Sequence, residues 1–255
     1  MIPRLIGMVH LAPLPGAPRY AGDFEADAAD AVADAERLVE AGFDALMVEN
    51  FGDVPFYADE APKITIAAMT RIVGAIADRV DVPIGVNVLR NDALGALAVA
   101  TATGAAYIRV NVLSGIMYTD QGPIVGKAAE VARARTQLDP RVQIMADVFV
   151  KHAVPPPGTN IQHAAADLVE RGLADAVIVS GPATGSEPST AELVAVRTAI
   201  GATPLLVGSG AHESNVSNLL AVADGVIAGT SLKIDGISAN AVDPERAARF
   251  VAAAR

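Results

Sequence analysis

Residues 204–236 read PLLVGSGAHESNVSNLLAVADGVIAGTSLKIDG, and this stretch decides the predicted fold. The apolar residues 205–207 predict a short buried strand that ends at a Gly-Ser-Gly turn. A helix over 213–222 leads to a second strand over 225–228 and a second turn of small residues. Glycine lets an anion approach main-chain N–H groups, and the ends of the last two strands of a (β/α)8 barrel often hold a phosphate. The stretch therefore predicts two barrel strands and a phosphate-binding site at Gly208, Ser209, Gly210, Gly229, Thr230 and Ser231.

The same alternation of strand and helix runs through the whole chain. Short β-branched runs alternate with alanine-rich segments, which is typical of βα units with a parallel sheet. The predicted strands are 5–10, 45–49, 84–88, 107–110, 142–149, 176–180, 205–207 and 225–228. The predicted helices are 24–40, 64–79, 92–101, 124–138, 161–171, 190–200, 213–222 and 244–254. Eight strands and eight helices in 255 residues fit one α/β (β/α)8 TIM barrel, a single domain over residues 1–255.

Prolines and glycines repeat with a two-strand rhythm. Every second predicted strand is preceded by a proline that presets an extended chain, namely Pro3, Pro83, Pro140 and Pro204. The others follow or begin at a glycine suited to a helix C-cap or a tight turn, namely Gly42, Gly104, Gly172 and Gly225. The blocks 83–115 and 204–236 also align without a gap. This repeat favours a closed barrel over an open doubly wound sheet.

Composition limits the classes of function. The formal net charge is −10, 52% of residues are hydrophobic, and there is no cysteine. An acidic chain argues against nucleic-acid binding, and the lack of cysteine excludes disulfides, thiolate nucleophiles and cysteine-bound metals. The N-terminus lacks the features of a signal peptide, and no apolar run reaches the ~18 residues that span a membrane. We therefore expect a cytoplasmic protein with no transmembrane segment and no nucleic-acid partner.

Polar residues stand at the carboxyl ends of the predicted strands, where (β/α)8 barrels place their active sites. Asp147 is the most informative, because a carboxylate in a buried run is costly unless it is paired or functional. The alternative for Asp147 is a structural salt bridge to Arg109 on the neighbouring strand. Strand alternation puts Asp147, Phe149 and, if the strand stays regular, Lys151 on one side. The candidate catalytic residues are His10, Glu49, Asp147, Lys151 and His152.

Each of these candidates leaves alternatives open. Lys151 could form a Schiff base, act as a general acid or pair with a phosphate. His10 and His152 could transfer protons or be hydrogen-bonded packing residues. Glu49 could be a base, or it could bind a ribose-like diol beside Asn50.

Further polar residues are predicted to orient a substrate: Asn50, Asn87, Arg109, Asn111 and Ser180. Lys233 either completes the phosphate site or is a surface lysine. The stretch 184–186, Thr-Gly-Ser, is either a phosphate or lid loop or an ordinary turn.

We expect no required cofactor. His10, Glu49 and Asp147 could together bind a divalent ion, but no ligand spacing makes that interpretation specific. The two glycine turns permit FMN, yet with no tryptophan and 4% aromatic residues little remains to stack on a flavin.

The chain resembles the BtpA/SgcQ family over essentially its whole length. The resemblance rests on IGMVHLAPLPGAPRY (6–20), GFDALMVENFGDVPF (42–56), IRVNVLSG (108–115), ADVFVKHA (146–153), VSGPATG (179–185), VGSG (207–210) and ADGVIAGTSLKIDG (223–236). It implies a fold similar to phosphate-binding TIM barrels. Members from photosynthetic bacteria are associated with photosystem I accumulation as assembly or stability factors, and others look like sugar-operon enzymes.

Two classes of function follow. The first is an enzyme acting on a phosphorylated sugar or nucleoside-like metabolite by isomerisation, aldol or lyase chemistry, or glycosidic-bond change, which proton transfer can support. The alternative is a non-catalytic photosystem I assembly factor, for which the polar strand ends would be unnecessary. By analogy with other barrels we also expect a homo-oligomer.

Overall fold

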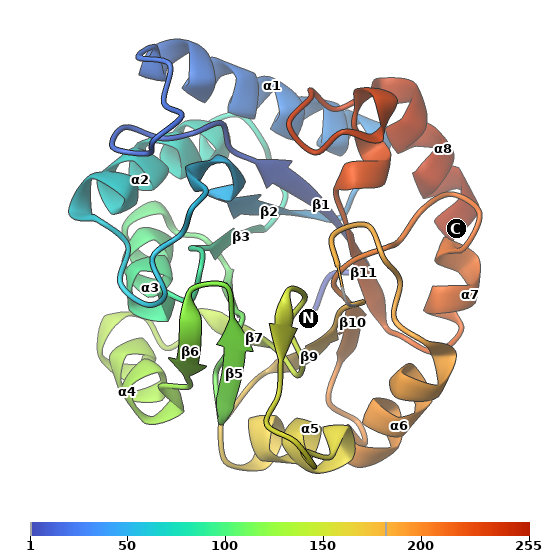
Figure 1. Ribbon diagram of the computed structural model, residues 1–255. Coiled ribbons are helices and arrows are strands. Elements are labelled where there is room, and N and C mark those ends of the chain that lie inside the picture. Colours follow the sequence, from blue (N-terminus) through green and yellow to red (C-terminus); the bar gives the residue numbers. More distant parts are fainter. Residues whose placement is uncertain (1, 182) are drawn as a thin grey trace.

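The structure, a computed structural model, describes residues 2–181 and 183–255, and its parallel strands form a closed barrel (Figure 1). The barrel strands are β1 (Leu5–His10), β2 (Ala45–Glu49), β3 (Ile84–Asn87), β4 (Tyr107–Val110), β7 (Gln143–Asp147), β9 (Ala176–Val179), β10 (Leu205–Val207) and β11 (Gly225–Ala228). The last strand, β11, pairs in parallel with β1 and closes the ring. The predicted (β/α)8 barrel is confirmed.

Helices surround the barrel and cover its outer face (Figure 1). They are α1 (Phe24–Ala41), α2 (Lys63–Ala77), α3 (Ala93–Thr103), α4 (Ala128–Leu138), α5 (Ile161–Glu170), α6 (Thr190–Ile200), α7 (Val216–Leu220) and α8 (Pro244–Ala254), with 3₁₀ turns at Phe51–Asp53, Thr230–Leu232 and Ile234–Gly236. Helix α1 shows how the sequence sets these bounds. Asp23 caps its first turn, Gly42 ends it in the left-handed conformation, and its apolar face is buried. Gly104 ends α3 in the same way, as predicted.

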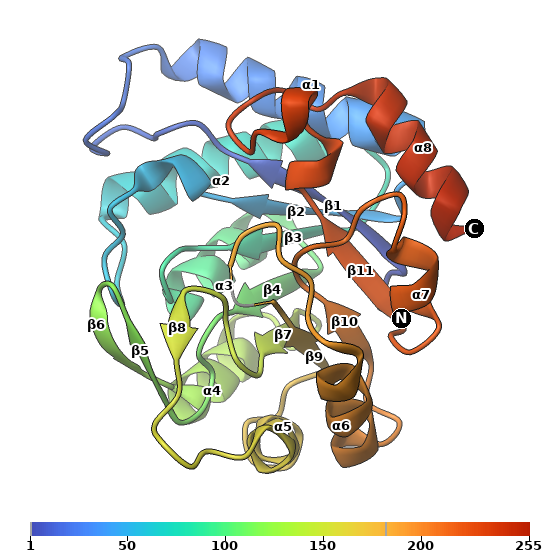
Figure 2. The same ribbon diagram turned by 45° about the vertical axis from the view of Figure 1, so that its right-hand side comes forward.

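A small antiparallel sheet was not predicted. It consists of β5 (Ile116–Thr119), β6 (Gly122–Val125) and β8 (Ala153–Val154). Figure 2 shows it beyond the end of the barrel towards which the arrowheads of β1 and β2 point. The predicted helix 124–138 therefore begins only at Ala128, because residues 122–125 pair with β5.

Other predicted elements were too wide. The strand predicted over 142–149 ends at Asp147, and the helix predicted over 213–222 is limited to Val216–Leu220. Of the glycines predicted to sit at a helix C-cap or a tight turn, Gly172 lies in the turn after α5, whereas Gly225 is part of a strand. Gly225 begins β11, where an added Cβ would lie 2.8 Å from the carbonyl oxygen of Arg4, so close backbone packing explains this glycine.

The core has two layers. The outer layer lies between barrel and helices, and the inner layer fills the barrel with side chains such as Met8, Met47 and Met145. Tyr107 also lies inside, and its hydroxyl donates a 2.5 Å hydrogen bond to the carbonyl oxygen of Leu46. Its ring occupies the space beside Gly85, where an added Cβ would lie 1.9 Å from a ring carbon.

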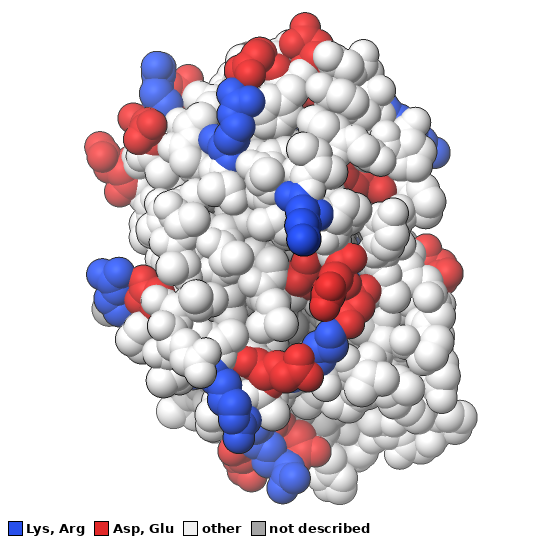
Figure 3. All heavy atoms as spheres, turned by 90° about the vertical axis from the view of Figure 1, so that its left-hand side faces the viewer, with Lys and Arg blue, Asp and Glu red and all other residues white. Residues whose placement is uncertain are grey.

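Surface charge is dispersed on the face shown in Figure 3, where Lys and Arg lie beside Asp and Glu. Of the helices in residues 2–181 and 183–255, none combines the length and the apolar character needed to cross a bilayer.

Candidate active site

The carboxyl ends of the barrel strands form the mouth of the barrel. Met8, Met47, Tyr107 and Met145 belong to the inner core layer, so strand alternation turns the residues two positions later towards the same interior. The interior-facing positions at the mouth, taken in strand order around the ring, are His10, Glu49, Asn87, Arg109, Asp147, Ser180, Gly208 and Gly229. Six polar side chains and two glycines therefore meet at one end of the barrel.

Asp147 is held in a buried ion pair with Arg109. Oδ2 accepts from Arg109 Nε and Oδ1 from Arg109 Nη2, both at 2.8 Å, and both side chains are fully buried. Asn111 Nδ2 and Ser180 Oγ each donate to this carboxylate at 3.0 Å. The salt bridge considered as the alternative from the sequence is therefore present. With both oxygens taken, Asp147 fixes the direction of the Arg109 guanidinium.

Glu49 is the opposite case. It is 1% exposed, and neither of its carboxylate oxygens has a hydrogen-bond partner among the described residues. His10 and Asn87 flank it on the neighbouring strands in direct register. In the described part of the chain, His10 Nδ1, Asn87 Oδ1 and Arg109 Nη1 also lack partners. A group of buried polar atoms at the mouth is therefore available to a ligand.

Positive charge gathers at this mouth although the whole chain carries −10. Arg90, Arg109 and Lys151 are buried there and feel the charges of Glu49 and Asp147. Burial lowers the pKa of Lys151, and the negative charge of Glu49 opposes this effect. Burial together with the positive charges of Lys233 and Lys151 lowers the pKa of His10 well below its ordinary value, so its imidazole is neutral at pH 7.

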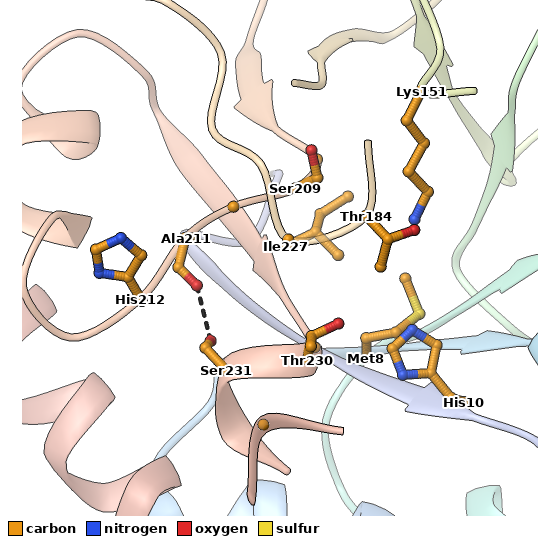
Figure 4. A pocket seen from close by; sticks show the side chains of 15 residues that line it. Met8, His10, Lys151, Thr184, Ser209, Ala211, His212, Ile227, Thr230 and Ser231 are labelled. Atoms are coloured by element: carbon orange, nitrogen blue, oxygen red, sulfur yellow. Dashed lines mark hydrogen bonds between the residues drawn. The ribbon is translucent and has the colours of Figure 1, made fainter. Parts of the chain in front are cut away.

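A cavity of about 180 Å³ opens on the glycine side of the mouth (Figure 4). Gly208 and Gly229 on its wall leave no room for a side chain, since a Cβ on Gly208 would lie 2.5 Å from Ile178 Cγ2, and one on Gly229 would lie 2.7 Å from His10 Cε1. Figure 4 shows Lys151, Thr184, His10 and Thr230 around the hollow. The predicted phosphate residues lie together on its wall: Gly208, Ser209, Gly210, Gly229, Thr230 and Ser231.

The hydroxyl groups on this wall already have partners. Ser209 Oγ accepts from Gly181 N and donates to Ser186 O, both at 2.9 Å, and Ser231 Oγ donates to Ala211 O at 2.7 Å. Thr230 Oγ1 bonds with Ser238 Oγ at 2.7 Å. By contrast, no described residue accepts a hydrogen bond from the backbone N–H of Gly210, Ala211, Thr230 or Ser231. The wall therefore offers main-chain donors more than hydroxyls.

Lys151 and His152 come from the loop after β7. Lys151 lines the cavity, and its ammonium has no hydrogen-bond partner among the described residues. His152 Nε2 lies 2.9 Å from Thr184 Oγ1 and accepts from Thr184 N at 3.3 Å, which ties this loop to the one after β9. Thr184 and Gly185 lie in a turn and line the cavity. Phe149 packs instead against apolar clusters, because the strand ends at Asp147.

Two predicted residues, Lys233 and Asn50, use their side chains to bond groups away from the phosphate turns. Lys233 is 1% exposed and donates to Asp34 Oδ2 at 2.6 Å, so it is not a surface lysine, and its ammonium points to this buried carboxylate rather than to the phosphate turns. Asn50 uses its amide on Asp53 Oδ2 at 3.0 Å and on the N–H of Leu89 at 2.7 Å. Lys233 therefore ties the segment after β11 to helix α1, and Asn50 ties the segment after β2 to the one after β3.

The sequence interpretation missed Arg90. It follows β3 in the loop, is 4% exposed, and donates to the backbone oxygen of Lys151. A signal existed, because this arginine comes three residues after Asn87 at the end of a predicted strand. Within the described ranges, no group of three or more His, Asp or Glu is arranged to hold a metal ion.

A model of the BtpA family matches residues 2–255. The chain belongs to the BtpA family. Family relatives include a Thermococcus kodakarensis protein, 51% identical over 98% of this chain and 95% of that protein. The photosystem I biogenesis protein BtpA of Synechocystis is 46% identical over 98% of this chain and 87% of its own length. The putative sgc region protein SgcQ of Escherichia coli is 31% identical over 97% of this chain and 92% of its own length.

Solved structures share the barrel but little sequence. Tryptophan synthase of Mycobacterium tuberculosis superposes with a TM-score of 0.64 at 19% identity, covering 99% of this chain and 93% of that one. Phosphoribosyl anthranilate isomerase of Thermococcus kodakaraensis gives a TM-score of 0.58 at 16% identity, covering 99% of both chains. At these identities the likeness shows the fold of this BtpA-family chain.

Proposed function

We propose that this BtpA-family protein is an enzyme that acts on a phosphorylated sugar or nucleoside-like metabolite. One observation carries the proposal: Gly210, Ala211, Thr230 and Ser231 line a cavity at the barrel mouth, and their main-chain N–H groups have no acceptor among the described residues. Converging N–H groups at glycine turns suit a phosphate, which accepts several hydrogen bonds at once. Lys151 adds a positive charge at the same cavity.

The reaction in this proposal depends on proton transfer. His10 lines the cavity, and its neutral imidazole can accept a proton at pH 7. Burial lowers the pKa of Lys151, so its ammonium gives up a proton more readily than that of an exposed lysine, which suits a general acid or base. Isomerisation, aldol or lyase chemistry, and glycosidic-bond change all need such groups.

Asp147 serves a different purpose in the proposed enzyme from the general base considered from the sequence. Its two oxygens accept four hydrogen bonds, from Arg109, Asn111 and Ser180. Because both oxygens are engaged by these donors, we assign Asp147 the role of positioning Arg109.

A second candidate function is photosystem I assembly without catalysis. The 46% identity to the Synechocystis photosystem I biogenesis protein favours it. That candidate gives no role to the unpartnered N–H groups of the cavity, so we place it second.

The test is ligand binding by purified protein, measured by calorimetry and by thermal stability. The ligands are inorganic phosphate, sugar phosphates and nucleotides. A ligand at a hundred times its Kd should raise the free energy of unfolding by about 2.7 kcal/mol. Lys151→Met should weaken phosphate binding about tenfold or more, because it removes a charged donor. The matched control is Lys63→Met, since Lys63 is exposed at the start of α2.

Equal binding by wild type, Lys151→Met and Lys63→Met would contradict the role of Lys151 in the cavity. A folded wild-type protein that binds neither inorganic phosphate nor any phosphorylated compound would overturn the proposed function and favour the assembly factor.

A further inference from the structure

Unpartnered buried polar atoms concentrate at the barrel mouth. Of the seven such atoms in the described residues, five belong to the mouth: both oxygens of Glu49, Asn87 Oδ1, Arg109 Nη1 and His10 Nδ1. A buried polar atom without a partner costs about 1–3 kcal/mol, so such a concentration marks a place where a ligand supplies the partners. These atoms lie on β1 to β4, next to the cavity but on the other side of His10.

The chemistry of these atoms selects the group that would bind. Glu49 and Asn87 offer three acceptor oxygens, and Arg109 Nη1 is a donor. A phosphate is disfavoured beside the Glu49 carboxylate. A cation is disfavoured beside the buried charges of Arg90, Arg109 and Lys151. Hydroxyl groups are neutral and both donate and accept, and two neighbouring hydroxyls can donate to the two oxygens of one carboxylate.

The spacing between this group and the glycine turns fits a sugar phosphate. Gly229 follows β11, Glu49 ends β2, and β1 lies between those two strands. Two inter-strand spacings of about 4.8 Å each put the two sites about 10 Å apart around the barrel. A pentose or hexose phosphate covers this distance between its phosphate and its ring hydroxyls.

We propose that Glu49, Asn87 and Arg109 form a subsite for two vicinal hydroxyl groups of a sugar whose phosphate lies at the glycine turns. This inference rests on the proposed function and names its substrate class, a polyhydroxylated phosphate ester. Glu49 is then a binding residue, and proton transfer is left to His10 and Lys151.

The experiment compares sugar phosphates that differ by one hydroxyl. Calorimetry measures the Kd of inorganic phosphate, ribose 5-phosphate against 2-deoxyribose 5-phosphate, and glucose 6-phosphate against 2-deoxyglucose 6-phosphate. The proteins are wild type, Glu49→Gln, Asn87→Leu and the control Glu40→Gln, whose side chain is exposed on α1. Circular dichroism and a thermal melt verify that each variant is folded.

We expect wild type and Glu40→Gln to bind at least one complete sugar phosphate tenfold or more tighter than its deoxy partner. Glu49→Gln should reduce this ratio to about one while the Kd of inorganic phosphate stays within twofold. If Glu49→Gln does not fold, Asn87→Leu provides the same test, because it should also reduce the ratio of the two Kd values.

Two results would overturn the inference in different ways. If inorganic phosphate binds and Lys151→Met weakens it, but no hydroxyl preference exists or Glu49→Gln keeps it, the hydroxyl subsite is wrong and the phosphate site stands. If neither inorganic phosphate nor any ester binds wild type, both the subsite and the proposed function fail.

Discussion

The ion pair of Arg109 and Asp147 controls how single residues are arranged at the mouth. Burying two charges costs several kcal/mol, and this cost is offset only when geometry is good and the remaining hydrogen bonds are made. Here the pair is bidentate and Asn111 and Ser180 satisfy the carboxylate, while Arg109 Nη1 is left without a described partner. The pair therefore holds Arg109 Nη1 in a fixed position as a donor at the barrel mouth that no described residue engages.

His10 gives stability a pH dependence. The unfolded imidazole titrates near its ordinary pKa of about 6.5, whereas in the folded protein the pKa lies well below this value. Between these two pKa values only the unfolded state binds the proton, so the free energy of unfolding falls as pH decreases through about 6.5. The largest slope from this one group is about 1.4 kcal/mol per pH unit.

We therefore expect His10→Gln to lose less stability than wild type between pH 7 and pH 5, as measured by urea unfolding at each pH. The carboxylates titrate in both proteins, so the difference isolates His10. His163→Gln is the control, because His163 is exposed on α5. Parallel pH profiles of wild type and His10→Gln would show that His10 is not buried in its neutral form.

At this scale the sequence predicted which residues meet but not how they pair. Period-two alternation from buried strands was enough to bring His10, Glu49, Asn87, Arg109, Asp147 and Ser180 to one end. It offered the pair of Arg109 and Asp147 as one alternative but could not decide for it or show that Glu49 is left unpartnered, because this depends on side-chain directions across three strands. It also could not reveal that Lys233, 199 positions after Asp34, pairs with it.

Between elements, one glycine decides how β3 and β4 fill the barrel. Gly85 gives its space to the ring of Tyr107, whose hydroxyl is bonded to β2. In this part of the inner core, the Tyr107 ring of β4 packs into the space that the missing side chain of Gly85 leaves on β3.

Gly85→Ala should reduce the free energy of unfolding by about 1–3 kcal/mol, because its Cβ would overlap the buried Tyr107 ring. Gly74→Ala is the matched control. Gly74 lies within α2 with no heavy atom within 4 Å of its added Cβ, so alanine should stabilise the helix by about 0.5–1 kcal/mol. Urea unfolding measures both. If Gly85→Ala were as stable as wild type, close packing by Tyr107 would not constrain this position.

Helices and strands were predicted well where the local sequence pattern agrees with the strand pairing of the barrel. Five of the eight barrel strands have the predicted bounds, because an apolar run between proline or glycine signals defines a parallel strand. The sheet of β5, β6 and β8 was missed because its strands are two to four residues long and one partner is distant in sequence. The sequence did carry a hairpin signal, because the apolar run Ile116–Thr119 is followed by the turn residues Asp120-Gln121-Gly122.

In the whole molecule, the chain closes on itself at two levels. Strand β11 pairs with β1, and helix α8 packs against α1. Phe250 of α8 is 1% exposed and stacks on Phe43, with ring centroids 5.7 Å apart. The first and last βα units therefore share one core, and neither can be lost without opening the barrel.

Phe250→Ala should lower the free energy of unfolding by about 3–5 kcal/mol, since it leaves a cavity at this closure. Far-UV circular dichroism and tyrosine fluorescence should show the same lowered midpoint, because a closed barrel unfolds as one unit. Tyr57→Ala is the control, as Tyr57 is 63% exposed, and it should change stability by less than about 0.5 kcal/mol. Separate transitions for the two probes in Phe250→Ala would contradict cooperative closure.

The glycines at the mouth also bear on how the family can diverge. A methyl group at position 208 would approach Arg109 Nη2 to 3.0 Å, and one at 229 would approach His10 Cε1 to 2.7 Å. Drift at either glycine must therefore be accompanied by a change in the side chain it faces. Position 229 should covary with 10, and position 208 with 178, 180 and 109, among descendants of this barrel, so a shift of specificity passes through coupled substitutions rather than single ones.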